Sequence, residues 1–521
     1  MKNKILILPM QPTPNGRMHI GHGSGTYLRA DILGRALKVR GHNVSIITGS
    51  DAFENWVLAD AKQSGRTPDE TCTYYHEAIF EDLNKLDINF DVWIDPRKPD
   101  HYEGYLKTHE NVLKWLQETN HAYHEEENVP YSLETGEALM GTWIAGECPY
   151  CGGASGGSSC TFCGAHFQPE ELINPKSRLD NSPLEWRKVK SWFARPEDPK
   201  QIINNLTDAG IREVWMEAVN KYIEHQGGRI RLSEPGNWGM KSNMVSKEFI
   251  LKNPYYLYSV YCGEVYMNRE KDAIHPLHPD SEVTTIGVFG NDNSTPGLIA
   301  PHSIAQGSGG KLKPFDYTIV NGMLLLEGKK CSTSKRHGIW LSELLEGETE
   351  ISSDELRYFV SHAPLDEGSA NISLDDLVSN INSFRNWVSQ KLVPVVQEVQ
   401  NATTVIQYNE KLANLLKKQN SDLNPNRMDL PTAVASLEGW MYDTTTEKGE
   451  WLLGIALLGA PIIPELAKNI WNQIGLSGEP SIDKIENKEI HVHENTFECR
   501  VKPLLSVESL LPYVHLAGVH A

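Results

Sequence analysis

The hydrophobic positions at the start of the chain predict alternating strands and helices. Ile5–Leu8 form a continuous apolar run, which is typical of a parallel strand that is buried on both faces. A helix is expected from about residue 24 to residue 40, and 44–47 is a second apolar run. Strand, helix and strand in this order favour an α/β fold with a doubly wound parallel sheet.

The pattern continues through the middle of the chain. The further elements expected there are a helix opening at Thr67, a strand at 90–94, a helix at 101–118, a strand at 121–125 and a mostly apolar strand at 315–326. Residues 182–228 are expected to be mostly helical, with Trp186, Trp192 and Trp215 in the core.

After residue 350 the pattern becomes helical. The expected helices span 375–400, 408–419, 430–446 and 449–474. Amphipathic helices in this succession could form an α-helical bundle. Residues 479–521 carry no recognised motif and are expected to form a tail.

Composition limits the class of protein. With 521 residues, 40% hydrophobic and 22% charged, the chain should form two to four globular domains. No apolar run is long enough to span a membrane, and the first residues have too short an apolar run and too many prolines for a signal peptide. We therefore expect a cytoplasmic protein without a membrane partner, whose oligomeric state the sequence leaves open.

The net charge of −19 counts against a nonspecific coat of nucleic acid, where a basic face would dominate. It does not exclude a structured RNA, because an acidic protein can still present a local basic groove. The one compact basic group is Lys329, Lys330, Lys335 and Arg336.

Four of the eight cysteines lie in one cluster of two CxxC pairs. They are Cys148, Cys151, Cys160 and Cys163. Two such pairs direct four thiolates at one point, which predicts a tetrahedral Zn²⁺ site without an open position, hence a structural metal. Disulfides are the alternative, and they are less expected in a cytoplasmic chain.

Candidate chemistry gathers where the first two strands end. After a turn rich in proline, His19 and His22 stand at the start of a helix, where free N–H groups suit a phosphate. Gly21 between them would let a ligand approach the backbone. Histidines at such a place are also often surface residues or caps. Asp51, after the second strand, is either a ligand-binding carboxylate or a helix cap.

The segment PTPNGRMHIGH resembles the HIGH motif of class I aminoacyl-tRNA synthetases, in particular the methionyl branch. The segment EGKKCSTSKRHGIW resembles the family's KMSKS loop, with Lys330–Ser334 in its five places and Thr333 where a lysine is usual. A P-loop is excluded as a rival because Gly322 and Gly328 have the wrong spacing. Together with the cysteine knuckle, these motifs follow the family's order over roughly residues 5–370.

The resemblance implies an ATP-dependent ligase that forms an aminoacyl-adenylate and transfers the amino acid to tRNA, with Mg²⁺ accompanying ATP. It implies catalytic roles for His19, His22, Lys330 and Lys335, and ATP binding by Asn15, Gly21, Asp292, Ser332 and Ser334. It further implies that Gln11, Thr13, Asp51 and Tyr258 bind the amino acid and that the four cysteines bind Zn²⁺. Here Asp51 would hold the α-amino group, Asp292 the ribose, and Lys335 could supply the charge missing at Thr333.

The resemblance also implies a domain organisation. Its parts are the first half of a Rossmann-type domain (1–118), a connective insertion with the zinc knuckle (119–235), the second half (236–330), a KMSKS-like loop and stem (331–374), a bundle resembling anticodon-binding domains (375–478) and a tail (479–521).

The amino-acid pocket departs from the family. Gln11 and Thr13 stand where the family usually has a hydrophobic residue and a tyrosine, and Tyr258–Cys262 replace its Trp-Phe-Asp-Ala-Pro tract. Three interpretations stay open: a ligase of the methionyl type, a paralogue that activates another amino acid for a tRNA or a non-ribosomal acceptor, and a non-catalytic relative. The altered pocket predicts that methionine is not the best substrate, whereas the intact His19, His22, Asp51 and Lys330 argue against a non-catalytic protein.

Overall fold

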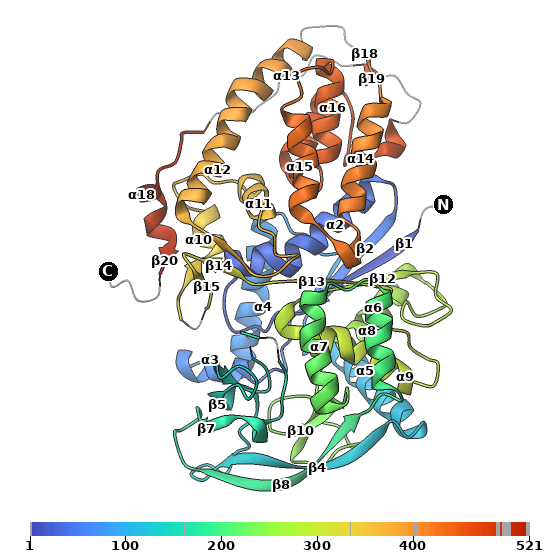
Figure 1. Cartoon of the computed structure of the whole chain (residues 1–521), viewed down its shortest axis with the longest axis vertical. Helices are drawn as coiled ribbons and strands as arrows, with labels where there is room; N and C mark the ends of the chain where they lie inside the picture. The colour runs from blue at the N-terminus through green and yellow to red at the C-terminus, as the bar shows by residue number, and fades with distance from the viewer. Residues whose placement is uncertain are drawn as a thin grey trace.

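The computed structural model describes residues 3–160, 162–163, 165–333, 335–400, 405–485, 490–491 and 502–516. Figure 1 shows helices from the second half of the chain at the top, a parallel sheet across the middle, and a region with two long strands at the bottom. Among the described residues, no helix is both long and apolar enough to cross a bilayer.

The central sheet has five parallel strands. They are β1 (Lys4–Pro9), β2 (Asn43–Gly49), β3 (Val92–Ile94), β12 (Thr284–Gly290) and β13 (Tyr317–Asn321), in the order β13-β12-β1-β2-β3. The order turns outward in both directions from β1, which confirms the predicted doubly wound α/β sheet and places the binding crevice at the carboxyl ends of its central strands.

Helices cover both faces of this sheet. They are α2 (Leu28–Val39) and α4 (Pro68–Lys85) on one face, and α5 (Pro99–Glu118), α8 (Tyr255–Glu270) and α9 (Ala300–Gly307) on the other. Side chains alternate along β1, so Ile5 and Ile7 pack with Leu28 in one core whereas Leu6 and Leu8 pack with Tyr255 in the second. Both faces of β1 are therefore buried, as its continuous apolar run predicts.

The helix expected at 24–40 begins earlier and is interrupted. A short α1 (Ile20–His22) leads through a π turn (Gly23–Tyr27) into α2. Gly25 in this turn has the non-helical angles φ −89° and ψ −118°, and it faces Asn321 at the end of β13. The irregular turn lets the backbone approach the neighbouring strand closely, as π turns at functional sites often do.

The inserted region contains less helix than expected. It consists of β4 (Ala122–Ser132), β5 (Ile144–Glu147), β6 (Ala154–Gly156), β7 (Ile173–Ser177), β8 (Leu184–Ala194), α6 (Pro199–Asp208), α7 (Glu213–Gln226), β9 (Ile230–Arg231), β10 (Ser233–Pro235) and β11 (Phe249–Leu251). The expectation of helix was wrong for 184–194, which pairs with β4 over its whole length. Trp186 on β8 is 42% exposed, and only Trp215 of the three tryptophans is buried.

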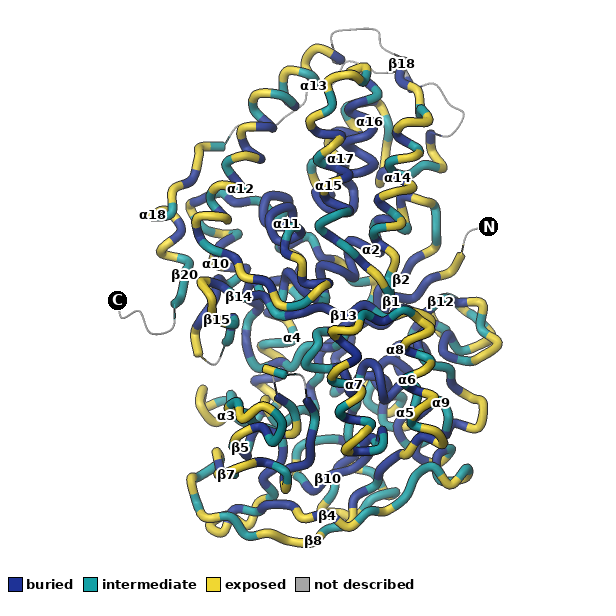
Figure 2. The backbone as a smooth tube through the Cα atoms, in the orientation of Figure 1, coloured by how far each residue is buried: buried dark blue, intermediate teal, exposed yellow. Residues whose placement is uncertain are grey.

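The second half of the chain is helical. Its helices are α10 (Leu341–Leu345), α11 (Ser353–Ser361), α12 (Leu374–Trp387) continuing through a π turn into α13 (Val393–Gln400), α14 (Glu410–Asp422), α15 (Leu430–Met441), α16 (Lys448–Gly459) and α17 (Pro464–Gln473). The single helix expected at 449–474 is broken at 460–463, because Pro461 and Pro464 cannot continue it. The buried α16 lies at the centre of this bundle (Figure 2).

One arginine joins the bundle to the sheet. Arg357 of α11 is fully buried, and its Nη2 donates to Asp31 Oδ2 of α2 at 2.7 Å and to the carbonyl of Pro461 at 2.7 Å. Its other donors reach the carbonyls of Leu86 and Ile462 at 3.2 and 3.1 Å. The guanidinium group thus ties three separate segments together at one point.

The expected tail returns to the sheet domain. After α18 (Val507–Leu510), β20 (Val514–His515) pairs antiparallel with β16 (Gly338–Ile339). Leu510 is fully buried, and His515 Nε2 lies 3.0 Å from Glu343. In Figure 1 the tail runs down the left side, along α12 to the region of β14 and β15. The last described residues therefore complete a wall beside the first loop of the chain.

Candidate active site

The two histidines lie where β1 turns into α1. Their rings stack with centroids 3.8 Å apart and an angle of 16° between the planes. The backbone N–H of His19 donates to His22 Nδ1 at 3.4 Å, which leaves Nε2 as the protonated nitrogen of a neutral His22. His19 is buried, and its Nδ1 has no hydrogen-bond partner. A buried nitrogen of this kind suits a place that a ligand completes.

Burial keeps both rings neutral. It lowers the pKa of His22 to about 4, with a further contribution from nearby Lys330. Burial and then His22 lower the pKa of His19 well below its ordinary value. At neutral pH the pair can therefore offer hydrogen bonds to phosphate oxygens, while Lys330 supplies the positive charge.

The second motif packs directly against the first. After β14 (Leu324–Leu326) and β15 (Lys329–Lys330), Ser332 and His337 exchange backbone hydrogen bonds of 2.7 and 3.0 Å. A Cβ at Gly16 would lie 2.6 Å from Thr333 Cγ2, so the glycine permits this contact. The loop that carries Lys330 thus closes over the turn that precedes the histidines.

The residues of this second motif differ in their burial. Cys331 is buried against Gly21, so the free space at that glycine is taken by the loop and by the His19 ring. Burial raises the pKa of the Cys331 thiol to about 11, as for an inert core cysteine. Lys330 is half-buried near the histidines, whereas Lys335 is exposed. Ser334 lies outside the described residues.

The carboxyl ends of β12 and β13 form the opposite side of the crevice. Asp292 lies in a short 3₁₀ turn directly after β12, and its Oδ1 accepts from Asn293 Nδ2 at 3.1 Å. Asn321 ends β13, and its Oδ1 accepts from the hydroxyl of Thr26 at 3.1 Å. These polar groups meet the π turn of the first loop, so the crevice has hydrogen-bonding groups on both sides.

Asp51 follows β2 and faces the inserted region. Its backbone N–H donates to the carbonyl of Pro12 at 2.8 Å, and its Oδ1 accepts from Asn253 Nδ2 at 2.9 Å. The helix-cap interpretation is wrong, because the cap of α3 (Trp56–Ser64) is Asn55. Burial, followed by nearby Glu54, raises the pKa of Asp51 well above its ordinary value.

Negative charge is in excess around Asp51. Lys252 Nζ lies 2.9 Å from Glu54 Oε1 and 3.3 Å from Glu234 Oε1, so three carboxylates share one ammonium group. Burial raises the pKa of Glu234 as well. Such a place, shielded from water, favours an additional cation.

Three buried polar groups beside Asp51 have no hydrogen-bond partner. They are Gln11 Oε1 and the hydroxyls of Tyr105 and Tyr258. Gln11 is 6% exposed, and the rings of Tyr105 and Tyr258 meet edge to face with centroids 5.6 Å apart. After burial, the charge of Asp51 is the next cause that raises the pKa of Tyr105, which places this hydroxyl near the carboxylate. Thr13 is half-buried, and its carbonyl accepts from the N–H of Asn15 at 2.9 Å.

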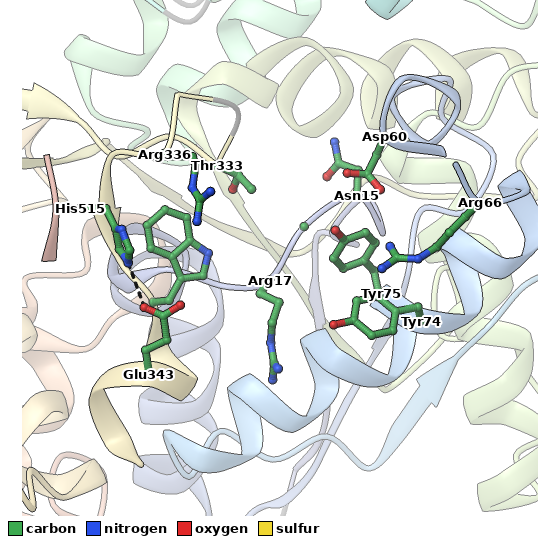
Figure 3. A pocket seen from close by; sticks show the side chains of 12 residues that line it. Asn15, Arg17, Asp60, Arg66, Tyr74, Tyr75, Thr333, Arg336, Glu343 and His515 are labelled. Atoms are coloured by element: carbon green, nitrogen blue, oxygen red, sulfur yellow. Dashed lines mark hydrogen bonds and ion pairs between the residues drawn. The ribbon is translucent and has the colours of Figure 1, made fainter. Parts of the chain in front are cut away.

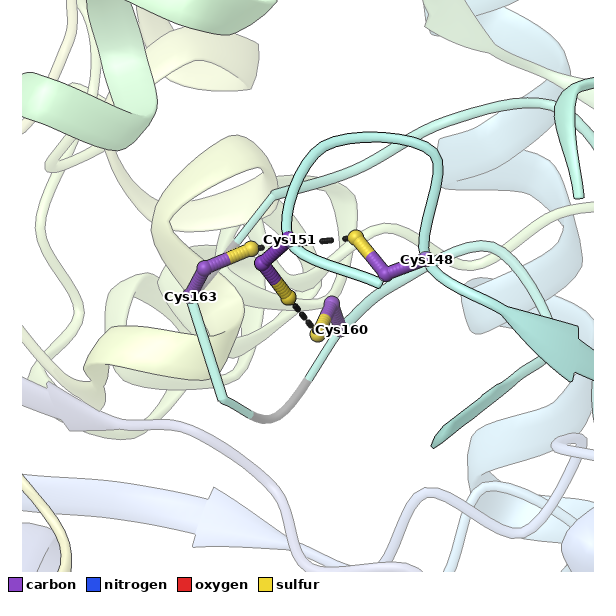
Figure 4. A group of neighbouring side chains, drawn as sticks. All are labelled: Cys148, Cys151, Cys160 and Cys163. Carbon is purple, nitrogen blue, oxygen red and sulfur yellow. Dashed lines mark hydrogen bonds between the residues drawn. The ribbon is translucent and has the colours of Figure 1, made fainter. Parts of the chain in front are cut away.

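The four clustered cysteines converge as predicted (Figure 4). Their sulfur atoms lie within 4.8 Å of one another, with 3.8 Å between Cys148 and Cys163 and 3.7 Å between Cys151 and Cys160. Tetrahedral zinc with Zn–S bonds of about 2.3 Å requires sulfur separations of about 3.8 Å. The donor set therefore fits one Zn²⁺.

Comparison with known proteins identifies the family. The family model described as "tRNA synthetases class I (M)" matches residues 6–388. The chain belongs to this family. It is 27% identical over 394 residues to the methionine--tRNA ligase of Thermoplasma acidophilum, an alignment that covers 73% of this chain and 70% of the relative. It is 29% identical over 407 residues to that of Methanocaldococcus jannaschii, covering 75% and 58%.

Solved structures share the fold. The methionyl-tRNA synthetase of Mycobacterium tuberculosis in complex with methionyl-adenylate superposes with a TM-score of 0.66 over 96% of this chain and 100% of that chain, at 14% identity. The likeness reaches beyond the residues of the family model and includes the helical second half.

Several residues at this candidate site were not predicted from the sequence. They are Tyr105, Lys252, Asn253, Asn321 and Trp340. The signal for Lys252 and Asn253 is a polar pair between an apolar strand and an aromatic helix, which points to a site only after β11 and α8 are placed. Of the tract Tyr258–Cys262, the structure places Tyr258 beside Tyr105, inside α8.

Proposed function

We propose that this protein is an ATP-dependent aminoacyl-tRNA ligase of the methionyl type. The observation that carries the proposal is the stacked, neutral pair His19 and His22 beside Lys330, at the carboxyl end of the parallel sheet, with the electronegative Asp51 site next to it. This combination provides phosphate contacts and an ammonium site in one crevice.

The reaction divides into two displacements. A carboxylate oxygen of the amino acid attacks the α-phosphorus of ATP, and pyrophosphate leaves. A ribose hydroxyl of tRNA then attacks the carbonyl carbon of the adenylate, and AMP leaves. Catalysis of this kind relies on positioning and on stabilising phosphate charge. Bound Mg²⁺ would add positive charge at the phosphates.

Each candidate residue has a role that follows from its chemistry. His19 and His22 donate hydrogen bonds to the phosphates, and Lys330 with Lys335 neutralises the departing pyrophosphate. Asp51 holds the α-ammonium group. Asn15, Gly21, Asp292, Ser332 and Ser334 are proposed to contact ATP, and Gln11, Thr13 and Tyr258 to line the amino-acid pocket.

Methionine is the first substrate to test, because the relatives are named methionine--tRNA ligases. A second candidate is a paralogue that activates an amino acid with a hydrogen-bonding side chain, for a tRNA or a non-ribosomal acceptor. Three unpartnered polar groups, Gln11 Oε1 and the hydroxyls of Tyr105 and Tyr258, favour it, since a thioether satisfies them poorly.

We also propose that the cysteine cluster holds one structural Zn²⁺, as a knuckle within the insertion. The helices of 375–478 would contact the anticodon region of tRNA. The domain limits 1–118, 119–235, 236–330, 331–374, 375–478 and 479–521, and a cytoplasmic location, remain predictions.

ATP–pyrophosphate exchange with each of the twenty amino acids tests the proposed function. Exchange should be supported by one amino acid far above the others, and His22→Ala should abolish most of it. The matched control is His278→Ala. His278 precedes the amino end of β12, whereas the crevice lies at the carboxyl ends of the strands, so this variant should exchange like the wild type. Exchange with no amino acid would favour a non-catalytic relative.

A further inference from the structure

A buried line of hydrogen-bonding groups runs from α5 to Asp51. The His109 ring of α5 is 1% exposed, and its Nδ1 lies 2.9 Å from the carbonyl oxygen of Tyr105. Its Nε2 lies 3.2 Å from Asn253 Oδ1, and Asn253 Nδ2 lies 2.9 Å from Asp51 Oδ1. His109, Asn253 and Asp51 thus form a triad in which Asn253 links the other two.

The triad does not fit a neutral histidine combined with an ionised aspartate. A carbonyl oxygen only accepts hydrogen bonds, so the single proton of a neutral His109 ring must lie on Nδ1, toward Tyr105. Nε2 then presents a lone pair to Asn253 Oδ1, which is a second acceptor. The 3.2 Å between these two atoms leaves no room for a water molecule. The triad therefore needs one more proton.

Another histidine of the protein does not need such a proton. His275 is half-buried beyond the end of α8, where its Nδ1 accepts from the N–H of Leu277 at 3.0 Å. Its Nε2 lies 2.9 Å from the carbonyl oxygen of Val260. One donor and one acceptor are what a neutral imidazole offers. The mismatch at His109 is therefore not a general result of packing a histidine against this core.

The additional proton has two places in the triad. A doubly protonated His109 would donate to Asn253 Oδ1. Alternatively, half a turn of the Asn253 amide keeps both contacts and exchanges donor and acceptor, so that Nδ2 donates to His109 and a protonated Asp51 donates to Oδ1. Burial lowers the pKa of His109 to about 4, whereas burial, followed by Glu54, raises the pKa of Asp51. The second place is therefore favoured.

The groups around the triad do not replace this proton. The titratable neighbours of Asp51 are Glu54, Cys72, Tyr105, Lys252 and Tyr258. Glu54 disfavours a second negative charge, and Lys252 is shared with Glu54 and Glu234. Burial raises the pKa of the thiol and of both phenols, so these stay neutral near neutral pH. The ring of Tyr105 also meets His109 edge to face, with centroids 4.6 Å apart.

The cavity of about 260 Å³ beside the histidine turn is separate from the triad. Its lining includes Asp60, Arg66 and Arg336, but none of the three triad residues (Figure 3). A change of charge in that cavity therefore takes place outside the triad.

We propose that His109 is a positioning residue that, through Asn253, keeps a proton on Asp51 until an ammonium group enters the site. This rests on the proposed function of Asp51. When the ammonium group binds, the O–H bond of Asp51 breaks, its proton passes to water, and the amide turns so that Nδ2 donates to the carboxylate. His109 Nε2 then faces an acceptor again, which opposes ionisation. The affinity for the amino acid thus depends on pH in a range set by a residue that does not touch it.

The pH dependence of KM in ATP–pyrophosphate exchange tests the proposal, with whichever of the twenty amino acids gives the fastest exchange. KM should rise on acidification as Asp51 becomes protonated. In His109→Gln the new amide suits either orientation of Asn253, so Asp51 ionises more easily. The midpoint of the rise should fall by about one pH unit, the equivalent of one hydrogen bond. At one unit below the wild-type midpoint, KM should then be about fivefold lower than in the wild type. A merely structural loss would raise KM at every pH.

A double substitution shows whether the effect passes through the amide. In an Asn253→Ala background, His109→Gln should shift the midpoint by less than about a third of that amount. The matched control is His275→Gln, which should leave the midpoint of the wild type unchanged. A midpoint that does not fall in His109→Gln, or that falls equally in the Asn253→Ala background, overturns the proposal.

Nitrogen-15 NMR of ligand-free, histidine-labelled protein gives a readout that is independent of catalysis. The His109 signals are those lost in His109→Gln. At neutral pH they should show a neutral ring protonated at Nδ1, whereas His275 should be protonated at Nε2. A doubly protonated His109 would place the proton at the other end of the triad and overturn the proposal. Absence of exchange in the wild type would instead overturn the proposed function, and the NMR measurement would still test the triad.

Discussion

Replacing Gln11 by methionine should stabilise the protein, although glutamine is the residue found there. Gln11 lies just after β1, is 6% exposed, and its Oε1 has no partner. Leaving a buried acceptor unsatisfied costs about 1–3 kcal/mol, and methionine removes that acceptor. The two side chains are unbranched and similar in volume, so repacking should cost less than about 1.5 kcal/mol. We expect a net gain of about 1 kcal/mol.

The matched control is Gln168→Met. Gln168 is also 6% exposed, but its Oε1 accepts a hydrogen bond from Arg231. Removing a hydrogen bond to a charged group should cost about 1.5–3 kcal/mol. Although the two side chains are equally exposed, the same substitution is therefore expected to raise the stability at position 11 and to lower it at position 168.

Amide hydrogen exchange measures both effects. It reports the free energy of local opening at each amide, so it remains usable in a multidomain chain that does not unfold in a single step. Protection should rise in β1 for Gln11→Met and fall in β4 for Gln168→Met. A loss of more than about 1 kcal/mol at β1 would refute the reasoning, since it would mean that the Gln11 amide has a partner in solution.

The same variant reports on the substrate. An amino acid that supplies a hydrogen bond to Gln11 should lose about 1–3 kcal/mol of transition-state binding, whereas exchange with methionine should change less than about threefold. A stabilised variant that loses activity would be an example of function maintained at a cost in stability. A large loss of methionine-dependent exchange in this variant would instead indicate that the Gln11 amide contacts methionine.

Four further outcomes are expected. His22→Ala should raise the adenylation barrier by about 2–4 kcal/mol in pyrophosphate exchange, and a wild-type rate would remove the histidine from catalysis. Elemental analysis of reduced protein should find one zinc per chain, absent in Cys148→Ser; no metal in the wild type contradicts the zinc site. The KM for the amino acid should rise on acidification at a higher pH than for an ordinary carboxylate, because the raised pKa of Asp51 protonates it earlier; an unchanged KM down to pH 4 would count against the ammonium site. Arg357→Met should lower the free energy of unfolding by about 3–5 kcal/mol in denaturant titration, since Asp31 loses a buried partner; a loss below 1 kcal/mol would show that the junction relaxes.

The sheet and the two signature segments could be predicted because their signals are local. The run Ile5–Leu8 is apolar throughout, and His19 and His22 follow the proline-rich turn within a few residues. The cysteines were equally accessible, since their spacing alone brings four sulfurs together. Each of these features depends on neighbours in the sequence.

The remaining parts of the site depend on contacts between distant segments. Asn253 reaches Asp51 and Asn321 reaches Thr26 only after tertiary folding has brought the ends of β2, β11 and β13 close to their partners. The tryptophans of Leu184–Ala194 suggest a helix that packs in the core, whereas the segment is a strand and Trp186 lies on its exposed face. Tertiary pairing with β4 decides that segment.

The pairing of β16 with β20 has a consequence for biosynthesis. Trp340 bridges to His19 on one side and meets the His515 ring edge to face on the other, with centroids 5.0 Å apart. While the chain is being translated, the histidine turn and Trp340 leave the ribosome long before Val514–His515 exist. A nascent chain that lacks β20 therefore carries both signature motifs with one wall missing. Closing it requires a contact between segments far apart in sequence, which is slow to form. The wall beside the histidine turn should then be completed only late in translation, after the helical bundle has been synthesised.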